Sequence, residues 1–146
     1  MSVPVYPCLW FDGNASEAAD FYCAVFHESR ILSKSPMVVM FELRGSQVMA
    51  LNGGPYFRFN EAISLVIECE TQEEIDHYWK QLTENGAESQ CGWVKDKFGV
   101  SWQIVPSVLS KLLNDANAEK SSRVLKSMLQ MKKLDIAELL EAFNGA

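Results

Sequence analysis

The stretch that decides the fold is residues 8–26, CLWFDGNASEAADFYCAVF, because its plan returns in residues 63–82, ISLVIECETQEEIDHYWKQL. Each stretch predicts an apolar strand, a short polar turn and a helix that carries two adjacent aromatic side chains. The copies match at one constant spacing: Asn14 with Thr71, Glu17 with Glu74, and Phe21-Tyr22 with Tyr78-Trp79. Such a duplicated unit usually builds a concave surface shared between its copies, so the repeat indicates both a fold and a binding site.

Each copy continues with short strands. The strands expected in the first copy are residues 5–11, 29–33, 37–43 and 47–51, and those in the second are residues 62–69, 88–91, 92–96 and 100–105. At the helix starts, Asn14 with Glu17 and Thr71 with Glu74 predict capping boxes. The sequence therefore predicts an α+β fold of two βαβββ modules that form an eight-stranded mixed-sheet cleft.

Beyond Pro106 the apolar period becomes helical. Ser121 or Ser122 is the expected N-cap of one helix, and Asp135 with Glu138 predicts a third capping box ahead of another. We expect residues 1–107 to form the paired modules, about 1–57 and 58–107, and residues 108–146 to be a helical extension of the same domain. The extension packs on its own domain or on a sister subunit; the alternative is a separate partner-binding helix.

Composition narrows the class of protein. A chain of 146 residues forms one ordinary domain. The net charge of −6, with scattered basic residues, argues against a nucleic-acid partner. No signal peptide is visible, and no apolar run is long enough to span a membrane. The four cysteines lack C-x-x-C spacing, which favours a cytoplasmic protein with reduced, mostly buried thiols.

Three motifs in order carry a family resemblance: LWFDGN at residues 9–14, ALNGGP at 50–55 and GWVKDKFGVSWQIVP at 92–106. With the paired modules, they resemble the PhnB-like branch of the vicinal oxygen chelate superfamily, which includes glyoxalases, bleomycin resistance proteins and extradiol dioxygenases. The resemblance spans almost the whole chain, including the tail. This branch is often labelled 3-demethylubiquinone-9 3-methyltransferase, but the chain has no glycine-rich turn for S-adenosylmethionine, so we do not take the label as a mechanism.

Metal-dependent members of the superfamily use four inward-facing His, Glu or Gln side chains. Carried over to this chain, the four positions are Val5, Ile63 or Ala62, Met49 or Ala50, and Gln103. One amide oxygen is not a metal site, and His27, His77 and Glu42 lie elsewhere in the pattern. The resemblance therefore predicts a fold that has lost its metal, and we expect no cofactor.

A cleft without its ion remains as the candidate site. Strand alternation, set in phase with the metal positions, places Leu9 and Phe11 in the cleft together with Ser101 and Gln103, while Trp102 packs outward on a helix. Three further residues are candidates with open alternatives: Asn52 as a ligand contact or a turn residue, Cys91 as a reactive or a structural thiol, and Trp93 as a stacking or a core side chain. The resulting pocket suits a flat or aromatic small molecule.

Three functions follow from these observations. The first is a metal-free small-molecule-binding protein that neither enters a membrane nor binds nucleic acid; the resemblance implies a homodimer. The second is a small-molecule enzyme (a lyase, isomerase or transferase) that uses Gln103, Cys91 or an unlocated metal. The third treats the C-terminal helices as the functional part, as an interaction module.

Overall fold

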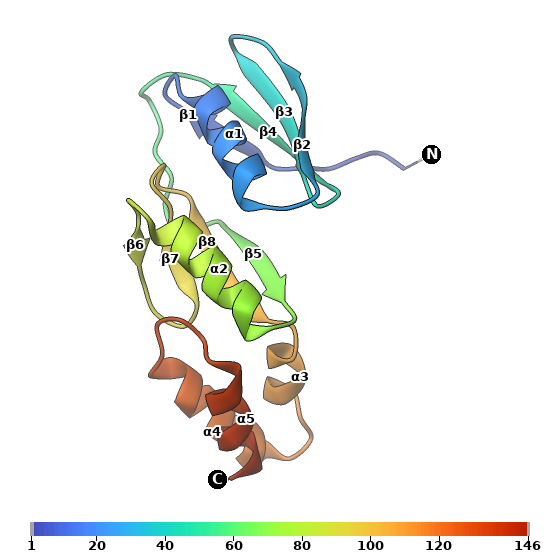
Figure 1. Ribbon diagram of the computed structural model, residues 1–146, viewed down its shortest axis with the longest axis vertical. Helices are drawn as coiled ribbons and strands as arrows, with labels where there is room; N and C mark the ends of the chain where they lie inside the picture. The colour runs from blue at the N-terminus through green and yellow to red at the C-terminus, as the bar shows by residue number, and fades with distance from the viewer. Residues whose placement is uncertain (1, 146) are drawn as a thin grey trace. The chain divides into compact units, whose positions relative to one another are not determined.

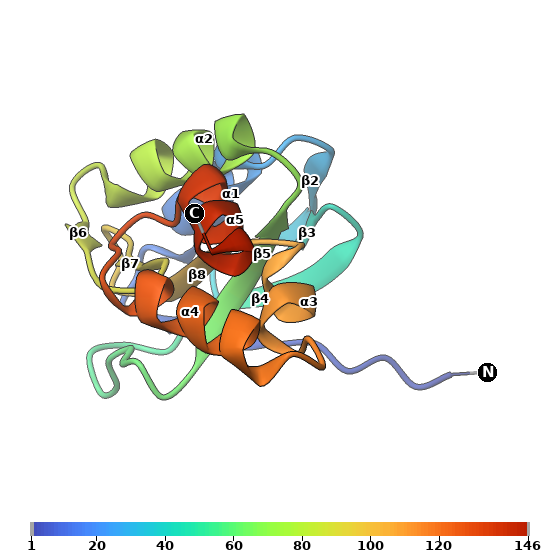
Figure 2. The ribbon, with the colours of Figure 1, turned by 90° about the horizontal axis from the view of Figure 1, so that it is seen from below.

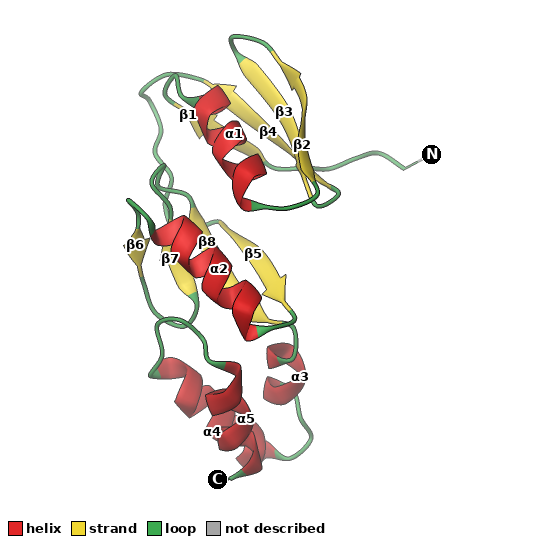
Figure 3. Ribbon diagram, viewed as in Figure 1, coloured by secondary structure: helices red, strands yellow, loops and turns green. Residues whose placement is uncertain are grey.

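The computed structural model describes residues 2–145, and the chain divides into two compact units, Met1–Phe59 and Asn60–Ala146 (Figures 1 and 3). Each unit contains a four-stranded mixed sheet with one helix along one of its faces. Three helices follow the second sheet. The predicted α+β class, with two βαβββ modules and a helical tail, is confirmed.

Unit 1 has the strand order β1-β4-β3-β2, in which β1 and β4 are parallel. Its elements are β1 Cys8–Phe11, α1 Ala15–Val25, β2 Ser29–Lys34, β3 Val38–Leu43 and β4 Ser46–Asn52. The buried face of the sheet lies under α1, where the Tyr22 ring stacks on Phe41 with centroids 6.1 Å apart. Six apolar side chains of the sheet form this core: Leu9, Phe11, Val39, Phe41, Val48 and Ala50.

The predicted orientation of the first strand is wrong, because Leu9 and Phe11 belong to the core under α1 and not to the face of the sheet that α1 leaves uncovered. The prediction took its phase from Val5, which lies before β1 begins, and the turn after the strand also differs between the two copies. Asp12 and Gly13 separate Phe11 from the helix N-cap, whereas one residue separates the last residue of the corresponding strand from its N-cap in unit 2. A one-residue difference exchanges the two faces of a strand, so the two copies are out of phase there.

Unit 2 repeats the plan with the strand order β5-β8-β7-β6, in which β5 and β8 are parallel. Its elements are β5 Ser64–Cys69, α2 Gln72–Thr83, β6 Ala87–Glu88, β7 Trp93–Lys95 and β8 Ser101–Pro106. Trp102 is buried in the core on the α2 side, as predicted. The face that α2 leaves uncovered is called the open face below.

The helix caps test the sequence prediction at the level of single hydrogen bonds. The Thr71–Glu74 capping box is present, and Asp135 accepts a bond from the Glu138 backbone N–H. The Asn14–Glu17 box is wrong, because the Asn14 side chain makes no capping bond. The expected N-cap at Ser121 or Ser122 is also wrong, since that helix begins earlier and is capped by Asn117.

The tail consists of α3 Leu109–Leu113, α4 Ala118–Leu129 and α5 Ile136–Asn144, which lie together in Figures 1 and 2. They share an apolar core made of Leu109, Leu112, Val124, Met131, Leu134 and Leu139. The α4–α5 connection is hydrogen-bonded to the module: the Cys91 and Gly92 amides donate to the carbonyls of Met131 and Lys132, at 2.9 and 2.8 Å. Gln72 of α2 donates through Nε2 to the Leu134 carbonyl in this connection and accepts through Oε1 from the Ile136 amide at the start of α5. None of the helices in residues 2–145 has the length and apolar character needed to cross a membrane.

Candidate functional site

The open face of the unit 2 sheet carries polar and aromatic side chains in two cross-strand rows. Ser101 lies between Ser64 of β5 and Lys95 of β7, and Gln103 lies between Val66 of β5 and Trp93 of β7. These pairings follow from strand alternation, because α2 takes the opposite side chains of each strand. The sequence predicted three site residues separately that are neighbours on two adjacent strands: Trp93, Ser101 and Gln103.

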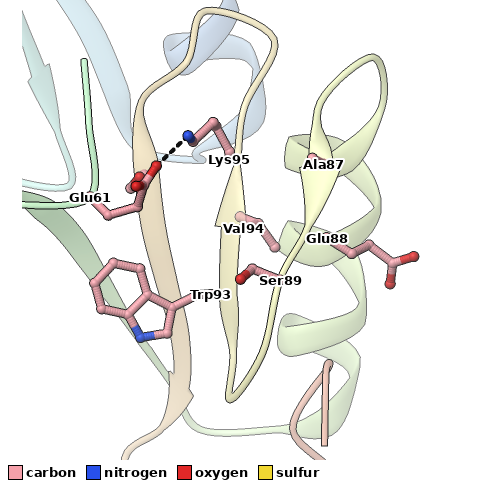
Figure 4. A pocket seen from close by; sticks show the side chains of 8 residues that line it. Glu61, Ala87, Glu88, Ser89, Trp93, Val94 and Lys95 are labelled. Carbon is pink, nitrogen blue, oxygen red and sulfur yellow. Dashed lines mark hydrogen bonds and ion pairs between the residues drawn. The ribbon is translucent and has the colours of Figure 1, made fainter.

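A pocket of about 240 Å³ opens beside these rows (Figure 4). It is lined by Glu61, Ala87, Glu88, Ser89, Trp93, Val94, Lys95 and Ser101. Two predicted site residues, Trp93 and Ser101, are among the lining residues, and Gln103 is the cross-strand neighbour of Trp93. The volume suits a ligand about the size of one ring system with short substituents, since sites for drug-sized molecules begin near 300 Å³.

The hydroxyl of Ser101 is the polar group that this pocket leaves unsatisfied. Ser101 is 2 % exposed, and its Oγ is fully buried without a hydrogen-bond partner among the described residues. Its neighbour Ser64 differs, because the Ser64 Oγ accepts a hydrogen bond from Gln103 Nε2 at 2.9 Å. Buried hydroxyls are nearly always paired, so an unpaired one beside a pocket is a candidate contact for a ligand atom.

An ion pair between Lys95 and Glu61 lies at the same pocket (Figure 4). The hydrogen bond from Lys95, together with its positive charge, lowers the pKa of the Glu61 carboxyl. Both side chains are largely exposed, at 42 % and 62 %, so the pair contributes little to stability and can open at small cost. Lys95 can therefore exchange Glu61 for an anionic or carbonyl oxygen of a ligand.

The geometry of strand β8 depends on Asp96, which is 3 % exposed. Its Oδ1 accepts from the Phe98 and Val100 amides at 2.8 and 3.0 Å, and its Oδ2 accepts from Trp102 Nε1 at 2.9 Å. These bonds close the turn between β7 and β8. They thereby fix where Lys95 and Ser101 stand on either side of it.

Cys91 lies outside the residues that line the pocket. It is half-buried with a positive φ of 58°, and its backbone N–H binds the tail. The other thiols are poor nucleophiles, because burial raises the pKa of Cys8 and Cys23 and raises that of Cys69 to about 12. A reactive role for Cys91 stays a prediction, whereas its backbone has a structural role.

Asn52 lies in unit 1 and is occupied by structural hydrogen bonds. Its Oδ1 accepts from the Ala15 amide at 2.9 Å, which caps α1, and its Nδ2 donates to the Pro36 carbonyl at 3.0 Å. The next residue, Gly53, lies against the Trp10 ring, where an added Cβ would come within 2.2 Å of a ring carbon. Trp10 Nε1 in turn donates to the Gly54 carbonyl at 2.9 Å. The Asn-Gly-Gly motif thus holds the end of β4, α1 and Trp10 together.

Of the four positions carried over from metal-dependent relatives, only Gln103 has a side chain with an oxygen or nitrogen donor. Val5 and Ile63 are 95 % and 74 % exposed and precede their strands, while Met49 faces Cys8 and Gln103 faces Val66. Within residues 2–145, no three His, Cys, Asp or Glu side chains gather into a group that could hold a metal ion. These side chains do not fit the oxygen and nitrogen cage that divalent cations require.

Sequence reasoning missed three residues of this region. Lys95 could have been found, because it stands two residues after Trp93 and so shares its face. Ser64 was placed in a strand but not weighed as a neighbour of Gln103. Glu61 lies in the connection before β5, and its pairing with Lys95 has no local sequence signal.

The paired βαβββ units and the open face define the class, and comparison with known proteins agrees. The family model described as 3-demethylubiquinone-9 3-methyltransferase matches residues 4–105. The PhnB protein from Bacillus cereus is 32 % identical, with a TM-score of 0.66 over 72 % of this chain and 100 % of that chain. Protein PA1353 from Pseudomonas aeruginosa is 21 % identical, with a TM-score of 0.61 over 72 % of this chain and 98 % of that one. No match was found among curated proteins.

The fold is that of the vicinal oxygen chelate superfamily. The fosfomycin resistance protein FosX from Listeria monocytogenes, in complex with Mn(II) and sulfate, is 12 % identical and has a TM-score of 0.55 over 77 % of this chain and 96 % of that chain. The chain belongs to the PhnB-like family described as 3-demethylubiquinone-9 3-methyltransferase, so the predicted family resemblance is confirmed. Its predicted extent is wrong at one end, because the family model stops at residue 105 and leaves out the tail.

Proposed function

We propose that the protein binds a small, flat, partly apolar molecule in the pocket on the open face of unit 2. The observation that carries the proposal is the buried, unpaired Ser101 hydroxyl in the wall of a pocket that also contains Trp93. A ring of the ligand would lie against the Trp93 indole, and a carbonyl or hydroxyl oxygen would accept the Ser101 hydrogen. Lys95 offers a second donor to an oxygen at the ligand edge.

The proposal is binding and not methyl transfer, although the family description names a methyltransferase. Enzymes with a doubly wound sheet bind their cofactor at the carboxyl ends of several parallel strands. Each sheet here has a single parallel pair, β1 with β4 or β5 with β8, and antiparallel neighbours otherwise. Ligand contacts by Asn52 and Cys91 stay predictions, since their known contacts are structural, whereas Leu9 and Phe11 are buried under α1 and are left out of the proposed site.

We also propose a cytoplasmic homodimer in which residues 1–107 and the helical extension 108–146 act as one domain. The four free cysteines support a reducing compartment. The bonds from Cys91, Gly92 and Gln72 to the tail support an extension that is integral to the second module. The homodimer rests on the family resemblance.

Thermal unfolding with a screen of aromatic amides and substituted quinones tests the proposed binding, because a ligand that prefers the folded state raises the Tm. A compound at 100 times its Kd adds about 2.7 kcal/mol to the free energy of unfolding. We expect at least one compound to raise the Tm of the wild type, and the Ser101→Ala and Trp93→Leu variants to bind it about tenfold more weakly. The first variant loses one buried hydrogen bond, and the second loses the aromatic contact with the ligand ring.

Glu68→Ala is the matched control, because Glu68 is exposed on the same face of β5 but does not line the pocket. It should bind the selected compound as the wild type does. Equal affinity for the wild type and for both pocket variants would show that the ligand binds elsewhere. A screen in which no compound shifts the Tm would contradict the proposal for this class of ligand.

A further inference from the structure

The outward side of α4 carries an exposed stripe of two small residues and two leucines. Ala118, Ser122, Leu125 and Leu129 recur at alternating four- and three-residue spacing, which is the spacing of a coiled-coil seam. All four are exposed, and the two leucines are 44 % and 53 % exposed. The inward side of the helix is fully used, since Val124 is buried in the tail core.

Contacts with α5 show which side of α4 packs inside the tail. Arg123 donates through Nε to the Ala142 carbonyl and through a terminal nitrogen to the Phe143 carbonyl, at 2.8 and 2.9 Å. The ammonium of Lys120 lies 4.9 Å from the Phe143 ring centroid. These side chains hold α4 against α5. The stripe on the opposite side is therefore rigid and faces away from the tail core.

We propose that this stripe packs against α4 of a second copy of the chain, with the two helices antiparallel. In that arrangement Ala118 faces Leu129 of the partner subunit, and Ser122 faces Leu125 of the partner subunit. Each small side chain thus meets a large one, which is how facing positions interdigitate without voids. A parallel pair would instead place leucine against leucine and leave the small residues facing one another across a gap.

Charge selects the same orientation. Glu119 and Lys126 both flank the stripe on one side, seven positions apart, and both are exposed. The side chain of Glu119 is 85 % exposed and forms an ion pair with Arg123 at 3.5 Å, which leaves much of the carboxylate open to a second cation. In an antiparallel pair the same flanks of the two helices adjoin, so Glu119 meets Lys126 of the partner subunit and the contact occurs twice by symmetry. A parallel pair would bring neither contact.

The length of the proposed α4–α4 contact determines how strong an association we expect. Twelve helical residues span about 18 Å, and a contact of that length falls below the area that stable dimers bury. We therefore expect association through α4 to rise with concentration. It adds to any dimer formed by other surfaces. The tail lies outside the family model, so this contact is independent of the ligand pocket and of the family fold.

Sedimentation of the full chain over a concentration series tests the proposal. The wild type should gain mass with concentration, and a Leu125→Gln/Leu129→Gln variant should stop at half the mass that the wild type reaches. Both leucines are exposed and glutamine is a good helix former, so circular dichroism should show an unchanged fold. Identical mass curves for the wild type and this variant would overturn the proposal.

A charge exchange distinguishes the antiparallel copy from any other occupant. Glu119→Lys should raise the dissociation constant about tenfold, because two attractions become two repulsions. Adding Lys126→Glu should restore it to within about twofold, the usual spread of independent effects. Glu73→Lys on α2 has the same charge change and should leave association unchanged. Failure of the double exchange to restore association would refute an antiparallel pairing of two copies.

Discussion

Replacing Ser101 with alanine should stabilise the protein, which is the unusual direction for a change at a buried position. The Ser101 Oγ is buried and unpaired, so folding removes its hydrogen bonds to water without replacing them. An unsatisfied buried hydroxyl costs about 1–3 kcal/mol, and alanine removes that cost while leaving the methylene in place. At the lower end, the gain of about 1 kcal/mol corresponds to a rise in Tm of about 3 °C for a chain of this length.

Ser64 provides the matched control, because it is the cross-strand neighbour of Ser101 on the same open face. Its Oγ accepts a bond from Gln103 Nε2, so Ser64→Ala removes a bond and leaves that amide donor unpaired. We expect a loss of about 1 kcal/mol for this variant. Two serine-to-alanine changes of equal volume on adjacent strands should therefore move the free energy of unfolding in opposite directions.

Urea unfolding of the two variants and the wild type, without added ligand, measures both changes. The midpoints should shift while the slopes stay equal, since neither change alters the surface exposed on unfolding. A Ser101→Ala variant that is less stable than the wild type, or equal to it, would show that the hydroxyl is satisfied in solution. The reasoning that makes it a ligand contact would then fail.

Three further predictions concern the framework around the site. Asn52→Ala should cost about 1 kcal/mol by removing the cap of α1, while Asn14→Ala should cost less than about 0.5 kcal/mol, as urea midpoints would show. Asp96→Asn should cost about 2 kcal/mol in the same measurement, because the amide cannot accept the Trp102 indole hydrogen where its own donors point. The Lys133 ammonium, followed by the Gln72 amide, lowers the pKa of Asp76, so this pair stabilises the fold above the ordinary carboxyl pKa of about 4 and loses its effect as the pH falls further. Lys133→Met should therefore be less stable than the wild type at pH 6, with a difference that shrinks below pH 4.

The elements of both modules could be predicted from the sequence because their signals are local. The Thr71–Glu74 capping box joins residues three apart, and the structure contains it. The Asn14–Glu17 pattern is as good, yet α1 is capped by Asn52, which is 37 positions from Ala15 in the sequence. Sequence alone cannot rank a local cap against a side chain that the fold brings from another strand.

The candidate site could be predicted only as far as it depends on local sequence patterns. Ser101 and Gln103 share a face because strand alternation is a local rule, and Trp93 joins them through the pairing of β7 with β8. Leu9 was placed on the wrong face because its phase was taken from Val5, which lies before the strand begins, where strict alternation does not hold. The unpaired state of the Ser101 hydroxyl could not be predicted, since it depends on the positions of all the surrounding polar groups in the folded chain.

The two copies of the duplicated module have diverged in how they use their polar groups, and this difference bears on the proposed site. Strand pairing makes Asn52 the counterpart of Pro106, because each faces the last residue of the parallel first strand in its unit. In unit 1, the Asn52 side chain accepts a hydrogen bond from the first amide of α1, and the Gly54 carbonyl accepts one from the Trp10 indole. In unit 2 a proline ends the strand and makes no such bond, while Ser101 near the other end keeps its hydroxyl unpaired. An unpaired buried donor costs stability unless a ligand satisfies it, so this difference supports placing the proposed binding site in the second copy.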